Sequence, residues 1–159
     1  MTSGSKIILF FIAASLGFSS SSCKKSKYDV IPTVFVNFTL NLNDPQFMVL
    51  LSPFTYLYVD KNTNNYGQNS AGYDDNGIIV FRYTEDEFFA YDRTCPYDYK
   101  ENNKSIRLNV VDDIYAVCPQ CSSKYALSAG GTPVKGVSRY PLKNYRTYFD
   151  GLYLTVSNY

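Results

Sequence analysis

The sequence contains no histidine and no tryptophan among its 159 residues. Histidine is the most frequent general base in enzymes and the commonest metal ligand, so its absence excludes Ser–His and Cys–His catalytic pairs and every imidazole-bound metal. The chain also lacks a charge excess, because 15 basic and 14 acidic residues give a formal net charge of +1. We therefore expect no nucleic-acid partner, since such a partner requires a basic surface.

The N-terminal region has no apolar run long enough to span a bilayer. Residues 7–18 are apolar, but a spanning helix needs about 20 such residues. Lys6 precedes this run, and Ser19–Ser22 and then Cys23 follow it. This order predicts a secretory signal peptide over residues 1–22.

Cys23 resembles the lipidated cysteine of bacterial lipoproteins, because it directly follows the small residues of the signal peptide. The resemblance implies a lipid anchor on Cys23 and a tether over residues 23–32, ahead of a folded domain at 33–159. We expect the protein in the bacterial cell envelope, bound to a membrane by this anchor and facing the periplasm. We expect the outer membrane rather than the inner one.

Aromatic residues are abundant, with 16 Tyr and 11 Phe, and they favour half-buried β-sheet surfaces. Asp44-Pro45 predicts the start of a short helix over 46–51, and little other helix is expected. The class is therefore all-β, a small barrel or sandwich of short antiparallel strands. The predicted strands cover residues 34–40, 54–59, 78–83, 87–92, 106–111, 114–117, 124–127, 145–149 and 152–156.

Two short cysteine motifs, Cys95-Pro96-Tyr97 and Cys118-Pro119-Gln120-Cys121, each follow a predicted strand. We expect the two loops, within residues 93–126, to meet in space. If Cys23 is acylated, three thiols remain, and at most one internal disulfide can form among them.

These motifs and the segments around them resemble the Rieske iron–sulfur domain, whose two Cys-x-His loops hold a two-iron cluster. Cys95 and Cys118 match the two cysteine ligands, whereas Tyr97 and Cys121 stand at the histidine positions. An ordinary Rieske centre needs two histidines, so it is excluded here. The further matching segments are Ser122–Tyr125, Gly130–Pro133, Pro141-Leu142 and Gly151–Val156.

Four interpretations of the cysteines stay open. The favoured one is a Rieske-like fold without a cofactor, in which the resemblance implies that Cys95 and Cys118 lie close and form a disulfide, with Cys118–Cys121 as the competing pair. A second is a variant 2Fe-2S cluster on the three cysteines, with Tyr97 or solvent as the oxygen ligand. A third is a single zinc or iron ion, completed by an acid such as Asp98. The fourth is a thiol–disulfide redox pair at Cys118 and Cys121.

We therefore expect the protein to be a lipid-anchored, non-enzymatic structural or partner-binding module with a degenerate cluster motif. The alternative is an electron-transfer protein that carries a variant 2Fe-2S or single-metal centre on its cysteines. Its partner would be a redox protein or another envelope protein. In neither case do we expect catalysis beyond the transport of electrons.

Overall fold

The computed structural model describes residues 29–63 and 69–158. The predicted signal peptide and lipidated Cys23 lie outside the described residues. Ten short strands dominate the described part, and the prediction of an all-β fold is confirmed. The strands are β1 (Asn37–Asn41), β2 (Thr55–Val59), β3 (Ile78–Arg82), β4 (Phe88–Asp92), β5 (Asn109–Val111), β6 (Tyr115–Val117), β7 (Lys124–Ala126), β8 (Thr132–Lys135), β9 (Asn144–Phe149) and β10 (Tyr153–Ser157).

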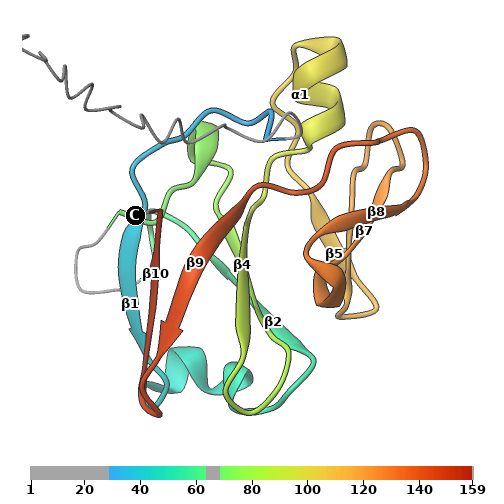
Figure 1. The fold of residues 1–159 in the computed structure, drawn as a ribbon. Helices are drawn as coiled ribbons and strands as arrows, with labels where there is room; N and C mark the ends of the chain where they lie inside the picture. The colour runs from blue at the N-terminus through green and yellow to red at the C-terminus, as the bar shows by residue number, and fades with distance from the viewer. Residues whose placement is uncertain (1–28, 64–68, 159) are drawn as a thin grey trace, which may run out of the picture.

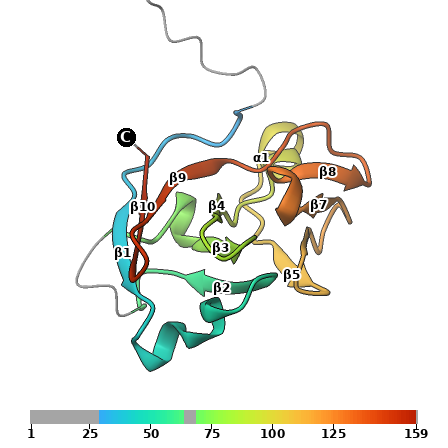
Figure 2. The same cartoon turned by 60° about the horizontal axis from the view of Figure 1, so that its bottom comes forward.

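The strands form two antiparallel sheets (Figures 1 and 2). The larger sheet has the strand order β1-β10-β9-β4-β3-β2, and the smaller one has the order β5-β6-β7-β8. The larger sheet curls, because Phe38 on its edge strand β1 and Val59 on its other edge strand β2 belong to the same buried core. The 3₁₀ helix η1 (Pro45–Leu51) adds Phe47 and Leu50 to that core.

Strand β3 separates two cores, and this explains its unbroken apolar run from Ile78 to Phe81. Ile78 and Val80 face the first core, inside the curled sheet, whereas Ile79 and Phe81 face a second core. Successive side chains of a strand point to opposite faces, so a strand that is buried on both sides must be apolar throughout. The second core lies between β3–β4 and the four-stranded sheet, and it contains Cys95 and Cys118 together with aromatic and aliphatic residues.

The predicted helix over 46–51 is present as the 3₁₀ helix η1, and Asp44 caps it by accepting a hydrogen bond from the backbone N–H of Gln46 at 2.9 Å. The short 3₁₀ helices η2 (Tyr73–Asp75) and η3 (Leu127–Ala129) occupy turns between strands. No helix in the described part of the chain is both long and apolar enough to cross a bilayer.

Two elements differ from the expectation. The segment after Cys95 was expected to be a loop, but it forms the α-helix α1 (Pro96–Asn102), which ends at Asn103 in a left-handed conformation. The Gly/Pro-rich segment that precedes Gly136 lies outside the predicted strands, but it contains the edge strand β8. Pro133 is compatible with β8 because an edge strand leaves one row of backbone groups unpaired.

Packed structure begins before residue 33, the boundary expected from the sequence. Ile31 is fully buried, and the buried ammonium of Lys143 lies 3.1 Å from a carboxylate oxygen of Asp29. The Lys143 Nζ also donates to the carbonyl of Ile31 at 3.3 Å and to the Thr33 hydroxyl at 3.2 Å. The chain is therefore fixed to the domain from Asp29 onwards.

Candidate metal centre

The two cysteine motifs meet, as expected, although β4 and β6, the strands before them, belong to different sheets. Strand β4 leads through Thr94 into Cys95, and β6 leads into Cys118. The backbone N–H of Cys95 donates to the carbonyl of Ile106 at 2.8 Å, which fixes the first loop beside the segment that enters β5. One donor atom from each of four side chains, Cys95, Asp98, Cys118 and Cys121, lies within 4.8 Å of the other three.

Helix α1 places Cys95 and Asp98 on one side. Cys95 precedes the helix, Pro96 occupies its first position, and Asp98 lies three residues after Cys95 in the first turn. Pro is favoured at the first helical position because its missing N–H would be unpaired there, so the Cys-Pro pair is itself a helix start. A side chain at the third position of a helix reaches back towards the N-cap, and Asp98 therefore points towards the sulfurs.

The second loop is a tight turn closed by the backbone. The N–H of Ser122 donates to the carbonyl of Cys118 at 3.0 Å, and the N–H of Cys118 donates to the carbonyl of Ser123 at 3.0 Å. Ser122 has a positive φ of 57°, which reverses the chain at this point. The turn brings Cys121 back towards the first loop, so that its Sγ lies 3.7 Å from the Sγ of Cys95.

Gly136 supports the second loop from the strand β8 side. A side chain on Gly136 would place its Cβ 2.6 Å from the Cα of Ser123, and its φ of +96° also favours glycine. The hydroxyl of Ser123 accepts a hydrogen bond from the backbone N–H of Ser138 at 3.1 Å and from the Cys121 thiol at 3.3 Å. The close approach at Gly136 thus holds the loop that carries Cys118 and Cys121.

The centre is largely shielded from solvent. Cys95, Asp98 and Cys118 are buried, with at most 1% of each residue exposed, while Cys121 is half-buried. All three cysteines of the described chain are free thiols in this structure, so the disulfide between Cys95 and Cys118 stays a prediction. The Sγ of Cys118 instead donates to a carboxylate oxygen of Asp98 at 3.0 Å.

Hydrogen bonds set the protonation of these groups. Burial by itself raises the pKa of Asp98, but the hydrogen bonds that its carboxylate accepts, first from Cys118 and then from Asn102, outweigh burial and hold the pKa below its usual value. A hydrogen bond from Cys95 lowers the pKa of Cys118 to about 7. The same hydrogen bond, together with burial, raises the pKa of Cys95.

Tyr125 is a neighbour of the centre that sequence reasoning did not assign to it. Its ring is fully buried in the second core, and its hydroxyl lies 3.6 Å from the Sγ of Cys95. Burial raises its pKa, so this hydroxyl stays protonated and can donate to the sulfur. Its place in the short strand β7, directly after the second loop, is the sequence signal that could have identified it.

One of the four interpretations gave Tyr97, or solvent, as the oxygen ligand of a variant cluster. The half-buried side chain of Tyr97 packs against the second core, next to the apolar residues of that core. Asp98 supplies the carboxylate oxygen that lies among the sulfurs. The candidate centre therefore consists of three thiols and one carboxylate.

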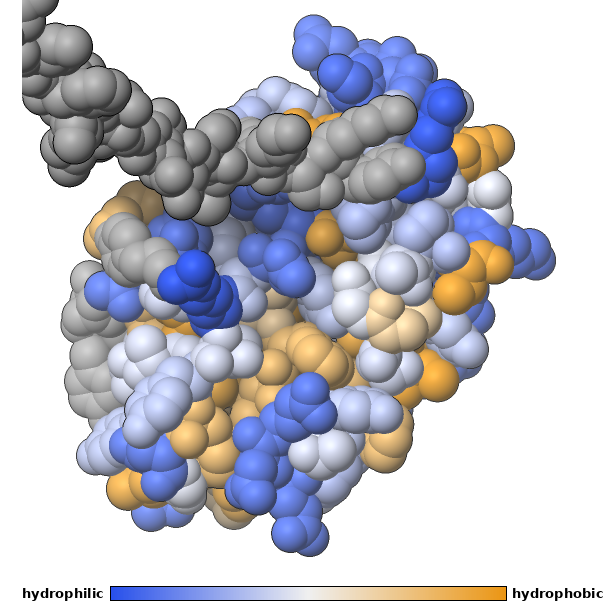
Figure 3. All heavy atoms as spheres, viewed as in Figure 1, coloured by the Kyte–Doolittle hydropathy of each residue, from blue (hydrophilic) through white to orange (hydrophobic). Residues whose placement is uncertain are grey.

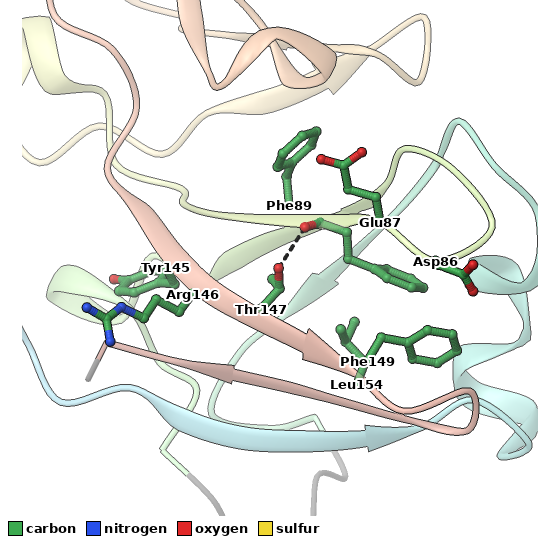
Figure 4. A pocket seen from close by; sticks show the side chains of 9 residues that line it. Asp86, Glu87, Phe89, Tyr145, Arg146, Thr147, Phe149 and Leu154 are labelled. Atoms are coloured by element: carbon green, nitrogen blue, oxygen red, sulfur yellow. Dashed lines mark hydrogen bonds between the residues drawn. The ribbon is translucent and has the colours of Figure 1, made fainter.

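A separate groove lies between β4 and β9, away from the cysteines, with a volume of about 440 Å³ (Figure 4). Apolar side chains of Phe88, Phe149 and Leu154 line it, and the Thr147 hydroxyl donates to the carbonyl of Phe88 at 2.7 Å. Figure 3 shows hydrophobic surface in the middle of this face of the molecule, with hydrophilic residues around it. Sequence reasoning gave no sign of this groove.

No family model matches the chain, and no curated protein does. Among solved structures, the chain is similar to the ferredoxin of carbazole 1,9a-dioxygenase from Nocardioides aromaticivorans IC177, with a TM-score of 0.46 and 16% identity over 80% of this chain and 100% of that one. It is equally similar to a chain in a complex of reduced oxygenase and oxidized ferredoxin in carbazole 1,9a-dioxygenase, with a TM-score of 0.46 and 16% identity over 80% and 95% of the two chains. At these scores neither likeness carries a functional argument.

Proposed function

We propose that this protein is a non-enzymatic, lipid-anchored envelope module with Rieske-like cysteine loops that bind metal. One observation carries the proposal: donor atoms from two loops, separated in sequence by more than a strand, converge within 4.8 Å. Burying a carboxylate is costly unless a cation or hydrogen bonds compensate its charge, and a metal bound between Asp98 and the sulfurs would supply that compensation. The metal would cross-link the two loops and thereby stabilise the four-stranded sheet.

A second function, one-electron transfer, is favoured by the exposure of Cys121. The three other donor residues are buried, whereas Cys121 is half-buried, so the centre is nearest to the solvent at Cys121. A thiolate-bound iron near the surface can exchange electrons with a docked redox protein. The metal that the protein takes in the cell decides between the two roles, since zinc has no redox chemistry.

The envelope location is part of the same proposal and rests on the lipoprotein-like order of residues 1–23. The ion pair between Asp29 and Lys143 supports a short connection to the membrane, because the domain holds the chain from Asp29 onwards. Between Cys23 and Asp29 the chain can extend by at most about 20 Å. A Cys23→Ser variant is expected to move the protein from the membrane fraction to the soluble fraction.

The metal proposal is tested on the full chain, expressed in a bacterium that processes lipoproteins and extracted from membranes without added reductant. Elemental analysis and the visible spectrum are compared with those of Cys118→Ser and of a control, Ser128→Ala, outside the loops. We expect bound metal in the parent and the control and its loss in Cys118→Ser. A metal-free parent with a Cys95–Cys118 disulfide would overturn metal binding and support the cofactor-free module.

Visible absorption separates the two functions. A colourless protein that contains zinc supports the structural role and contradicts electron transfer. A coloured protein that contains iron, and that is reversibly reduced and oxidised, supports electron transfer.

A further inference from the structure

We propose that the cysteine group is a mononuclear centre in which Asp98, rather than Tyr97, supplies the oxygen ligand, so that one tetrahedral ion takes three sulfurs and one carboxylate oxygen. This inference rests on the proposed metal binding and specifies its ligands and the number of ions. Among the four interpretations of the sequence, it selects the single ion completed by Asp98 over the two-iron cluster with Tyr97.

The separations of the donor atoms fit one ion. Metal–sulfur bonds of 2.3 Å in a tetrahedron place two sulfurs about 3.8 Å apart, and a sulfur and an oxygen about 3.5 Å apart. The Sγ atoms of Cys95 and Cys121 lie 3.7 Å apart, and the Sγ of Cys118 lies 3.0 Å from the Asp98 carboxylate. An ion would need only small shifts of these side chains.

A two-iron cluster requires a different arrangement. Each iron of such a cluster takes two of the four protein ligands, so the two ligand pairs stand on opposite sides of the cluster. The resemblance would assign Cys95 to one iron and Cys121 to the other. Here these two sulfurs are neighbours, and all four donor atoms lie within 4.8 Å of one another, which is the spacing of ligands on a single ion.

Helix geometry explains why Asp98 is the oxygen donor. Cys95 is the N-cap of α1 and Asp98 is the third residue of the helix, the position from which a side chain reaches back to the N-cap. The Nδ2 of Asn102, one turn further along, donates to the second carboxylate oxygen of Asp98 at 2.8 Å. This bond holds the carboxylate in place and leaves its other oxygen directed at the sulfurs.

The donor set also limits the metal. Three thiolates select zinc or iron over magnesium and calcium, which prefer oxygen ligands. One carboxylate among them remains compatible with zinc, because zinc binds Asp oxygens at about 2.0–2.2 Å. The bound ion is therefore a borderline-soft divalent cation, Zn²⁺ or Fe²⁺, for which Co²⁺ serves as a spectroscopic probe.

The test is a titration of the reduced, metal-free full chain with Co²⁺, followed by absorption in the sulfur-to-cobalt and d–d regions. Asp98→Asn keeps the size of the side chain and removes the anionic oxygen, Tyr97→Phe removes the phenol, and Asp86→Asn is the control at an exposed turn. We expect one Co²⁺ per chain with a tetrahedral spectrum. We also expect affinity lower by about 10- to 100-fold or more in Asp98→Asn, and unchanged affinity in the other two variants.

Asp98→Cys guards against the alternative that Asp98→Asn misfolds. If Asp98 is a ligand, the Cys variant binds Co²⁺ again, and its sulfur-to-cobalt absorption rises because a fourth thiolate has joined the ion. If Asp98 acts on the fold alone, Asp98→Cys loses Co²⁺ as Asp98→Asn does, and the assignment of Asp98 is overturned.

The remaining outcomes separate this inference from the proposed function. Two irons per chain with acid-labile sulfide in protein from cells would overturn the mononuclear centre and leave metal binding intact. Loss of Co²⁺ in Tyr97→Phe, with Asp98→Asn unaffected, would overturn the choice of oxygen ligand alone. Failure of the parent chain to bind Co²⁺ or Zn²⁺ would overturn both.

Discussion

The six-stranded sheet and the four-stranded sheet are stabilised in different ways. Strands of the larger sheet have five or six residues, and their inward side chains form a dry core that includes Phe38, Val80, Leu154 and Val156. Strands of the smaller sheet have three or four residues, and its edge strands β5 and β8 bury no residue fully. The smaller sheet therefore depends on its contact with the larger one and on the cysteine loops.

This difference indicates which sheet a bound metal would stabilise. Cys95 and Cys118 lie within the second core, beside Tyr125 and Leu108, at the joint between the two sheets. A metal bound there would cross-link the smaller sheet to the end of β4, much as a disulfide does in small domains with little core. The larger sheet has no such need, because hydrophobic burial already stabilises it.

The largest expected effect comes from a cavity in the first core. Phe38→Ala removes a fully buried ring from β1 and should cost about 3–5 kcal/mol of the free energy of unfolding. Because the smaller sheet packs on β3 and β4, both sheets should unfold together. Denaturant unfolding followed by far-UV circular dichroism measures the change, and Tyr148→Ala on the exposed face of β9 is the control. A loss confined to the larger sheet would contradict this dependence.

Removal of the metal should affect the smaller sheet selectively. With free metal at about 100 times its Kd, binding contributes about 2.7 kcal/mol, and a chelator removes that contribution. Hydrogen exchange followed by mass spectrometry should then show faster exchange in β5–β8 and α1, while β1, β9 and β10 stay protected.

The result is checked against Cys118→Ser, which should show the same pattern without a chelator. Equal loss of protection in both sheets would mean that they are one cooperative unit, and the contrast between them would fail.

Sequence patterns predicted the all-β class, most strands and the cap at Asp44, because these depend on periodicity and local turn chemistry. The meeting of the two loops was expected from the cysteine motifs that follow predicted strands and from the resemblance to the Rieske domain. The helix α1 was missed because it has only two turns and follows a cysteine, although Pro96 and Asp98 are ordinary helix-start signals. The choice between Tyr97 and Asp98 as the oxygen ligand depended on α1, so the sequence alone could not make that choice. The packing of Asp29 against Lys143 links residues 114 apart, and no local pattern encodes it.

A smaller effect is expected at the ion pair that fixes the start of the domain. Asp29→Ala leaves the buried Lys143 ammonium with two neutral oxygen acceptors, from Ile31 and Thr33, and should cost about 1–3 kcal/mol. Lys143 lies between Leu142, which belongs to the second core, and Tyr145, which belongs to the first core. Hydrogen exchange of Asp29→Ala will therefore show which of the two sheets the ion pair stabilises.

Lys61→Ala is the matched control for this ion pair, because it breaks an exposed pair with Asp75 that is worth less than about 1 kcal/mol. Equal effects of Asp29→Ala and Lys61→Ala would indicate that residues 29–33 are not firmly bound to the domain.

The smallest effect on stability is expected at Tyr125, where the consequence for the metal is the more informative one. Tyr125→Phe keeps the ring in the second core and removes the hydroxyl near the Cys95 sulfur, at a cost of about 0.5–1.5 kcal/mol. A hydrogen bond to a ligating sulfur withdraws charge from it and raises the reduction potential of a bound iron. In the iron-loaded protein, voltammetry should therefore give a lower potential for Tyr125→Phe than for the parent, with unchanged iron content.

Tyr91→Phe is the matched control, because it removes a buried hydroxyl of the same core that donates to the carbonyl of Leu127, and it should leave the reduction potential unchanged. Equal potentials in the parent and Tyr125→Phe would show that the second core supports the fold of the smaller sheet without tuning the centre.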